Sequence, residues 1–251
     1  MFLKICGIQN PEEARAAVDA GATAIGMLVG LTHKAEDKID EIRAREITFG
    51  LSDMVETVMV THLLDEAVIA KLARFIGVRA VQVHDDLPPA SMRSLAASLP
   101  GVRLIKAVHV TGSDAIERAY AYADVSDALL LDSRTHDRLG GTGLTHDWTI
   151  SRRIVEAVAP VPTYLAGGLK PENVEEAILT VGPAGVDVNS GVEDSQGNKD
   201  VGRMCGFLSK AKTALATIQI SVDTKAPPAN PTISSPTTPR SGCFGASNGE
   251  V

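Results

Sequence analysis

Two side chains that could move protons stand where short apolar segments end. Cys6 closes the run FLKIC (2–6), and Asp132 closes DALLLD (127–132) after three leucines. A thiol acts as a base when its surroundings lower its pKa, although a single cysteine is also common as a small buried apolar residue. A carboxyl group whose pKa is raised by burial acts as an acid, although Asp132 could equally cap the segment that follows. The two residues form a candidate acid–base pair.

Glycine-bearing segments follow the last three apolar runs of the chain. Glycine permits backbone conformations in which successive N–H groups converge on one anion. Each segment alone could be a plain loop, but three in succession predict a phosphate-binding site. The candidate residues are Gly141, Thr142 and Gly143 in the first segment, Gly167 and Gly168 in the second, and Ser190 and Gly191 in the third.

Short apolar runs alternate along the chain with segments of helical periodicity. Asn10 and Pro11 are typical of a helix start before the segment 11–21, and Pro171 stands near the start of another. Gly77 and Gly182 are typical of helix ends. The predicted buried strands are residues 2–6, 23–29, 57–62, 80–84, 103–110, 127–132, 162–167 and 185–190.

The order of these elements predicts a parallel sheet. Strands buried on both faces, each followed by a helix, are typical of α/β folds. Eight such units in residues 1–221 favour a single (β/α)8 barrel over a doubly wound open sheet. The first strand ends in C-G-I, where a dinucleotide-binding sheet would carry G-x-G-x-x-G. Barrel chemistry belongs to the carboxyl ends of strands, where the residues above are placed.

Composition limits the classes of function. The chain has 24 Lys and Arg against 31 Asp and Glu, a formal net charge of −7, which argues against a protein that coats nucleic acid or an anionic membrane. We expect neither a membrane span nor a secretory signal, and three scattered cysteines suggest no disulfide framework, so the cytoplasm is the expected compartment. Residues 222–251, rich in Pro, Ser and Thr, are predicted to be a disordered tail.

Four motifs in order carry a resemblance to a known family. They are K-I-C-G-I from Lys4, L-L-D before G-G-T-G, A-G-G-L-x-P-E-N-V, and V-D-V-x-S-G-V-E. Residues 1–215 thereby resemble the phosphoribosylanthranilate isomerases of tryptophan biosynthesis. Gln82-Val83-His84 is similar to the Q-L-H that follows the family's fourth strand, and Asp147-Trp148 matches its D-W.

The resemblance implies a barrel that catalyses an Amadori rearrangement without a cofactor, converting an N-ribosyl aminoaldose into an aminoketose. By this likeness Cys6 is the general base, Asp132 is the general acid, and the glycine-bearing segments hold the ribose 5-phosphate. The expected partner is a small phosphorylated substrate, and the expected state is a monomer or homodimer. Further candidates for contacts to the substrate are Lys4, Gln82, His84 and Asp187.

The segment after the second strand departs from the family pattern. The family usually carries an arginine there that meets the anthranilate carboxylate, but residues 27–39 contain none. His33 or Lys34 could supply the cation, or both could be solvated loop residues. Two alternatives therefore stay open, an isomerase of another phosphorylated sugar or ribosyl amine and an inactive barrel used as a binding module. The six histidines show no ligand spacing along the chain, so no metal site is predicted.

Overall fold

Strands and helices alternate along the chain. The structure is a computed structural model that describes residues 1–31, 37–51, 54–133 and 147–225. The strands are β1 (Phe2–Ile5), β2 (Ala24–Leu28), β3 (Glu56–Thr61), β4 (Ala80–Val83), β5 (Arg103–His109), β6 (Ala128–Asp132), β7 (Thr163–Leu165) and β8 (Gly185–Val188). The helices are α1 (Pro11–Asp19), α2 (Glu41–Gly50), α3 (Glu66–Ile76), α4 (Pro89–Ser98), α5 (Ala115–Ala123), α6 (Trp148–Ala157), α7 (Val174–Val181) and α8 (Val201–Lys225), with the short 3₁₀ helix η1 (Ser190–Val192) after β8.

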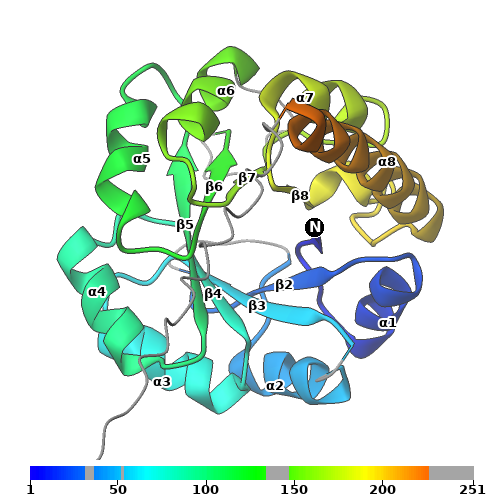
Figure 1. The fold of residues 1–251 in the computed structure, drawn as a ribbon. Helices are drawn as coiled ribbons and strands as arrows, with labels where there is room; N and C mark the ends of the chain where they lie inside the picture. The colour runs from blue at the N-terminus through cyan, green and yellow to red at the C-terminus, as the bar shows by residue number, and fades with distance from the viewer. Residues whose placement is uncertain (32–36, 52–53, 134–146, 226–251) are drawn as a thin grey trace, which may run out of the picture.

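The eight strands form a closed parallel barrel inside a ring of helices (Figure 1). Each strand pairs with the next along the chain, and β8 returns to β1, where Lys4 lies opposite Asp187. The predicted (β/α)8 barrel is confirmed. Each predicted strand overlaps an observed one, because long buried runs between Gly, Pro and polar residues leave little freedom in where a strand begins and ends.

Local chemistry at the helix ends follows the expected pattern. The side chain of Asn10 accepts a hydrogen bond from the backbone N–H of Glu13 at 2.8 Å and so caps α1. Gly77 and Gly182 end α3 and α7 in the left-handed conformation that glycine adopts without a steric penalty. The start of α7 differs from the prediction near Pro171, because Asn173 first closes a turn by accepting from the N–H of Lys170.

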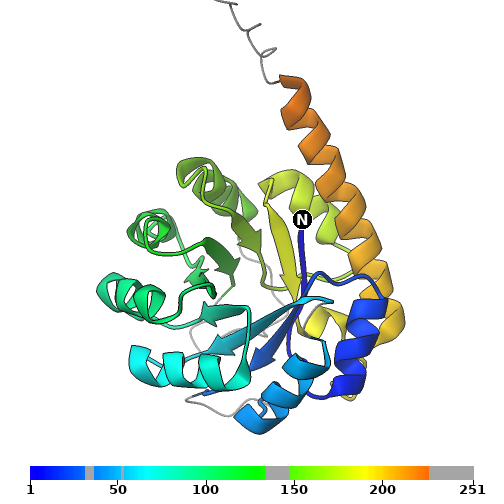
Figure 2. The same cartoon turned by 60° about the horizontal axis from the view of Figure 1, so that its bottom comes forward.

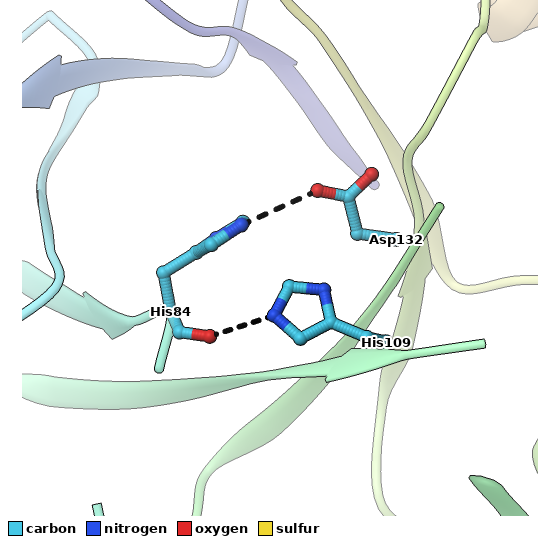
Figure 3. Close-up of side chains that lie close together, drawn as sticks. All are labelled: His84, His109 and Asp132. Carbon is cyan, nitrogen blue, oxygen red and sulfur yellow. Dashed lines mark hydrogen bonds and ion pairs between the residues drawn. The ribbon is translucent and has the colours of Figure 1, made fainter. Parts of the chain in front are cut away.

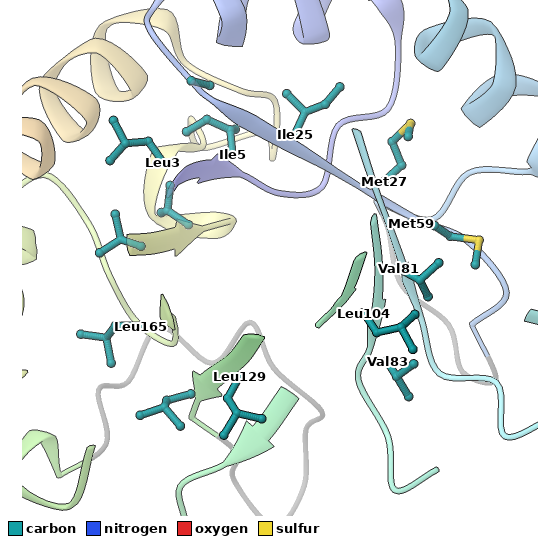
Figure 4. Close-up of a cluster of buried hydrophobic side chains, with 14 of the residues drawn as sticks. Leu3, Ile5, Ile25, Met27, Met59, Val81, Val83, Leu104, Leu129 and Leu165 are labelled. Atoms are coloured by element: carbon teal, nitrogen blue, oxygen red, sulfur yellow. The ribbon is translucent and has the colours of Figure 1, made fainter. Parts of the chain in front are cut away.

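Successive strand residues face opposite sides of the barrel wall. One set, including Leu3, Ile25 and Leu129, points outward and forms the main apolar core beneath the helices (Figure 4). The other set points into the barrel and contains smaller residues together with Phe2, Tyr164 and Cys6. Because strand side chains alternate with a period of two, Cys6 lies on the same inward face of its strand as Phe2 and Lys4.

Helix α8 extends well beyond the barrel at its carboxyl end (Figure 2). It continues to Lys225, so the first four residues assigned to the tail, 222–225, are helical. Extending an existing helix avoids the cost of nucleation, and no proline interrupts the sequence between Val201 and Pro227. Residues 226–251 lie outside the described part of the chain. Among the described helices, none has both the length and the hydropathy that a bilayer crossing requires.

Candidate active site

The carboxyl ends of the strands bring the predicted acid–base residues to one end of the barrel. Cys6 directly follows β1, and Asp132 is the last residue of β6. Both side chains are buried and face inward, and the charged pair of Lys4 and Asp187 influences the pKa values of both. The structure thus gathers a thiol, a carboxyl group and an ion pair from β1, β6 and β8.

The surroundings of Cys6 act against ionisation of its thiol. Burial raises its pKa to about 11, and the nearby ammonium of Lys4 only partly opposes this effect. A lowered pKa, which would make the thiol a base, is therefore not found in the protein without substrate, because desolvation outweighs the positive charges of Lys4 and Lys199. Gly26 on β2 makes the close approach of the two groups possible, since a Cβ there would lie 2.8 Å from Cys6 Sγ and 2.6 Å from Lys4 Cε.

Burial also raises the pKa of Asp132, but here the shift favours the predicted role, because an acid must be protonated. Burial, reinforced by the charge of Asp187, raises the pKa of its carboxyl group to about 7. The backbone N–H of Ser133 donates to Oδ1 at 2.7 Å and partly opposes the shift. A carboxyl group with this pKa can hold a proton near neutral pH and release it, which is what a general acid requires.

Lys4 and Gln82 lie inside the barrel, one residue or more before the ends of their strands. The Lys4 ammonium is completely buried and donates to Asp187 Oδ2 at 2.8 Å and to Gln82 Oε1 at 2.9 Å. Burial alone would lower the pKa of Lys4, but the charges of Asp187 and Cys6 outweigh it and the pKa is raised. These contacts make Lys4 a fixed cation beside the thiol; contact of Lys4, Gln82 or Asp187 with the substrate stays a prediction.

A chain of polar contacts continues from Gln82 through His84 to Asp132. Gln82 Oε1 accepts from Lys4, so its amide nitrogen faces His84 Nδ1 at 3.4 Å and donates to it. A neutral His84 then carries its proton on Nε2, which lies 3.5 Å from Asp132 Oδ2. Burial, followed by the neighbouring His109 and His62, lowers the pKa of His84 well below its usual value, so the imidazole is neutral. His84 is therefore placed to donate to an ionised Asp132.

The structure brings together histidines that the sequence reading left apart. The rings of His62 and His84 lie 4.7 Å apart, and those of His84 and His109 lie 4.9 Å apart, at the ends of β3, β4 and β5. The ligand atoms of His84, His109 and Asp132 all lie within 4.8 Å of one another (Figure 3). The spacing of the histidines along the chain does not reveal this cluster, because its members stand at the ends of three different strands. Placing the ends of the predicted strands side by side would have revealed the row.

The glycine-bearing loops after β7 and β8 pack closely on each other and on the acid. Gly167 and Gly168 have φ values of +79° and +66°, and a Cβ on Gly167 would lie 2.8 Å from Asp132 Oδ1. A Cβ on Gly191 would overlap the carbonyl oxygen of Leu169. The residues predicted to bind phosphate in these loops, Gly167, Gly168, Ser190 and Gly191, remain accessible to solvent. The predicted site residues Gly141, Thr142, Gly143, His33 and Lys34 lie outside the described residues.

Comparison with known proteins agrees with this arrangement. Residues 3–210 match the family model of N-(5'phosphoribosyl)anthranilate (PRA) isomerase. The chain is 42% identical over 214 residues to N-(5'-phosphoribosyl)anthranilate isomerase 2 of Methanosarcina mazei, an alignment that covers 84% of this chain and 94% of that protein.

Solved structures show the same relationship. The phosphoribosyl anthranilate isomerase of Thermotoga maritima matches with a TM-score of 0.75 and 35% identity, covering 85% of this chain and 99% of that one. An isomerase in complex with reduced 1-(o-carboxyphenylamino)-1-deoxyribulose 5-phosphate matches with a TM-score of 0.73 and 33% identity over the same shares of the two chains. Sequence, fold and the matched family model together place this chain in the N-(5'-phosphoribosyl)anthranilate isomerase family.

Proposed function

We propose that this chain converts N-(5-phosphoribosyl)anthranilate into the corresponding 1-deoxyribulose 5-phosphate, a step of tryptophan biosynthesis, with Asp132 as general acid and Cys6 as general base. The observation that carries the proposal is a buried carboxyl group with a pKa of about 7 at the same barrel end as an inward-facing thiol, in a member of this family. The ligand of the related complex has the carbon skeleton of the expected product.

Asp132 performs the first step, the opening of the ribose ring. Its carboxyl group donates a proton to the ring oxygen, the C1′–O bond breaks, and the amine nitrogen supplies the electron pair that forms a cationic Schiff base. The resulting carboxylate of Asp132 accepts a hydrogen bond from the N–H of Ser133 at Oδ1, and His84 Nε2 faces its Oδ2 at 3.5 Å. Stabilising the carboxylate in this way limits the cost of releasing its proton inside the barrel.

Cys6 performs the second step, the removal of the proton from C2′. The positive Schiff base acidifies this proton and favours the thiolate, as does the fixed ammonium of Lys4. The C–H electrons form the C1′–C2′ double bond, and the C=N electrons return to nitrogen. Protonation at C1′ and loss of the proton on the 2′-oxygen then give the aminoketose, so the reaction is a net isomerisation and requires no external oxidant.

The glycine-bearing loops support a site for the 5-phosphate. Gly167, Gly168, Ser190 and Gly191 come from neighbouring loops at the carboxyl ends of β7 and β8, where barrels of this type hold phosphate with backbone amides. We assign Gly141, Thr142 and Gly143 to the same site, and His33 or Lys34 to the anthranilate carboxylate, on the basis of the sequence alone.

Rescue of a tryptophan auxotroph that lacks this isomerase tests the proposal. We expect the full chain to restore growth without tryptophan and the Cys6→Ala variant, expressed to the same level, to fail. Absence of rescue by well-expressed wild-type protein would contradict the proposal and favour a different phosphorylated substrate. Equal rescue by Cys6→Ala would contradict the role of the thiol.

A further inference from the structure

We propose that His84, His109 and Asp132 form a binding site for a divalent transition-metal ion such as Zn²⁺, and that the bound ion blocks the isomerase reaction. The three ligand atoms come from the adjacent ends of β4, β5 and β6 and lie within 4.8 Å of one another (Figure 3). Only the second half of the statement, the inhibition, rests on the proposed function.

The donor set and its spacing suit a small transition-metal ion. Two imidazoles and one carboxylate are ligands that Zn²⁺ takes at about 2.0–2.2 Å, which places tetrahedral ligand atoms roughly 3.3 Å apart. His84 Nε2 and Asp132 Oδ2 are already 3.5 Å apart. At this length the contact is weak as a hydrogen bond, so little is lost when an ion replaces it. The remaining ligand atoms lie at most 4.8 Å apart, so side-chain rotations that move them by up to about 1.5 Å bring them to the same spacing.

His109 is oriented in the manner of a metal ligand. Its Nε2 lies 3.1 Å from the main-chain carbonyl oxygen of His84, to which it can only donate. A neutral His109 therefore carries its lone pair on Nδ1, and Figure 3 shows this second nitrogen on the side of the ring nearer Asp132. Histidine ligands characteristically donate their other N–H to a backbone carbonyl or a carboxylate, which holds the ring in place.

His84 is the ligand whose surroundings limit the affinity. The amide nitrogen of Gln82 faces His84 Nδ1 at 3.4 Å, which favours the proton on Nε2, the atom that must bind the ion. Metal binding thus requires the proton to move to Nδ1, opposite a donor. A carboxylate at position 82 would accept a hydrogen bond from the Nδ1–H of His84 and could still accept one from Lys4. The structure therefore predicts that Gln82→Glu strengthens metal binding, as carboxylate partners of ligating histidines do.

Occupancy of this site removes the acid. The ion would hold Asp132 as a carboxylate and release its proton, so the side chain could no longer protonate the ring oxygen. The inhibition should be reversed by a chelator, because the substrate-binding loops and Cys6 are not part of the ligand set.

Direct metal binding by the full chain, freed of metal with a chelator, tests the site. We would titrate the protein with Co²⁺ and follow its visible absorption, with Zn²⁺ calorimetry in parallel. The wild-type protein should bind one equivalent without the near-ultraviolet band that thiolate ligands produce. His109→Gln should weaken binding at least tenfold, and Gln82→Glu should tighten it at least tenfold.

His62→Gln is the matched control. The ring of His62 lies 4.7 Å from that of His84 but is not one of the three ligands, so its loss should leave the affinity within twofold of wild type. Circular dichroism would establish that each variant is folded. The proposal is overturned by a thiolate band, by wild-type affinity in His109→Gln, by equal weakening in His62→Gln, or by no binding at millimolar metal. Gln82→Glu keeps the test decisive if His109→Gln fails to fold.

Turnover measurements separate this proposal from the function itself. Zn²⁺ should inhibit the wild-type isomerase, and inhibition of His109→Gln, relative to its own metal-free rate, should require at least tenfold more metal. Metal binding without any isomerase activity would contradict the proposed function and leave the site intact. Activity that is insensitive to saturating metal would overturn the inhibitory role.

Discussion

At the scale of single residues, burial pushes Cys6 and Asp132 toward their neutral forms. The proposed mechanism needs a protonated Asp132, with a pKa of about 7, and an ionised Cys6, with a pKa of about 11. The four-unit gap means that roughly 10⁻⁴ of the free enzyme has both groups in the required state between these pKa values. The proposed mechanism therefore relies on the positive charge of the Schiff base to ionise the thiol.

This order of pKa values predicts a particular pH profile in metal-free enzyme. Below pH 7 Asp132 stays protonated while the thiolate fraction falls, so kcat/KM should drop tenfold per pH unit. Between pH 7 and 9 the loss of acid and the gain of thiolate cancel, and kcat/KM should be level. Steady-state kinetics across this range provides the check. A decline from pH 7 to 9 would mean that the pKa of the thiol lies well below 11 in the free enzyme.

The raised pKa of Asp132 also predicts a gain in stability when the charge is removed. The folded protein keeps a proton that the unfolded chain loses, so stability falls as pH rises from about 4 through about 7. At about 1.4 kcal/mol per pKa unit, Asp132→Asn should raise the free energy of unfolding by roughly 2–4 kcal/mol at pH 8 and change it little at pH 4. Urea denaturation at the two pH values tests this. Equal effects at both would show that the carboxyl group titrates normally.

At the scale of elements, two features build the site. Side chains alternate between the two faces of each strand, and Gly26 and Gly167 let neighbouring groups come close to the backbone. The sequence predicts which strand ends carry Cys6 and Asp132 because apolar runs mark strands. Spacing along the chain alone does not predict the row of His62, His84 and His109, because that row runs around the barrel, and it emerges only when the ends of the predicted strands are placed side by side. Nor does the sequence predict the sign of the Cys6 pKa shift, which depends on the balance between burial and the distance to Lys4.

Gly26 on β2 provides the test at this scale. Alanine would place a Cβ against Cys6 Sγ and Lys4 Cε, and displacing the thiol by even a fraction of an ångström should lower kcat at least tenfold. KM should change little, because the glycine-bearing loops follow β7 and β8, whereas Gly26 lies on β2. Gly50→Ala in α2, where a Cβ meets nothing within 4 Å, is the matched control and should keep full activity. Wild-type kcat in Gly26→Ala would show that the position of the thiol does not depend on this glycine.

At the scale of the whole molecule, the ion pair between Lys4 and Asp187 lies at the seam where β1 and β8 close the barrel. Desolvating two charges costs more than their attraction typically returns, so the pair is not explained by stability. Its position explains it better, since Lys4 is beside Cys6 and Asp187 raises the pKa of Asp132.

Breaking and replacing the pair separates these roles. Lys4→Met leaves Asp187 buried without its cation and should destabilise the fold by about 3–5 kcal/mol. The double variant Lys4→Met with Asp187→Leu should recover most of this loss in urea denaturation and remain inactive. A double variant as unstable as the single one would show that the pair stabilises the barrel; a fully active one would show that it does not serve the chemistry.

Single-turnover and steady-state rates of the purified chain on N-(5-phosphoribosyl)anthranilate test the central claim most directly. Wild-type protein should form the aminoketose, and Cys6→Ser and Asp132→Asn should each be slower by about 10²–10⁴-fold. Both variants should still bind the reduced product analogue. Near-normal turnover in either variant, or none in the wild type, would contradict the assignment of this thiol and this carboxyl group as base and acid.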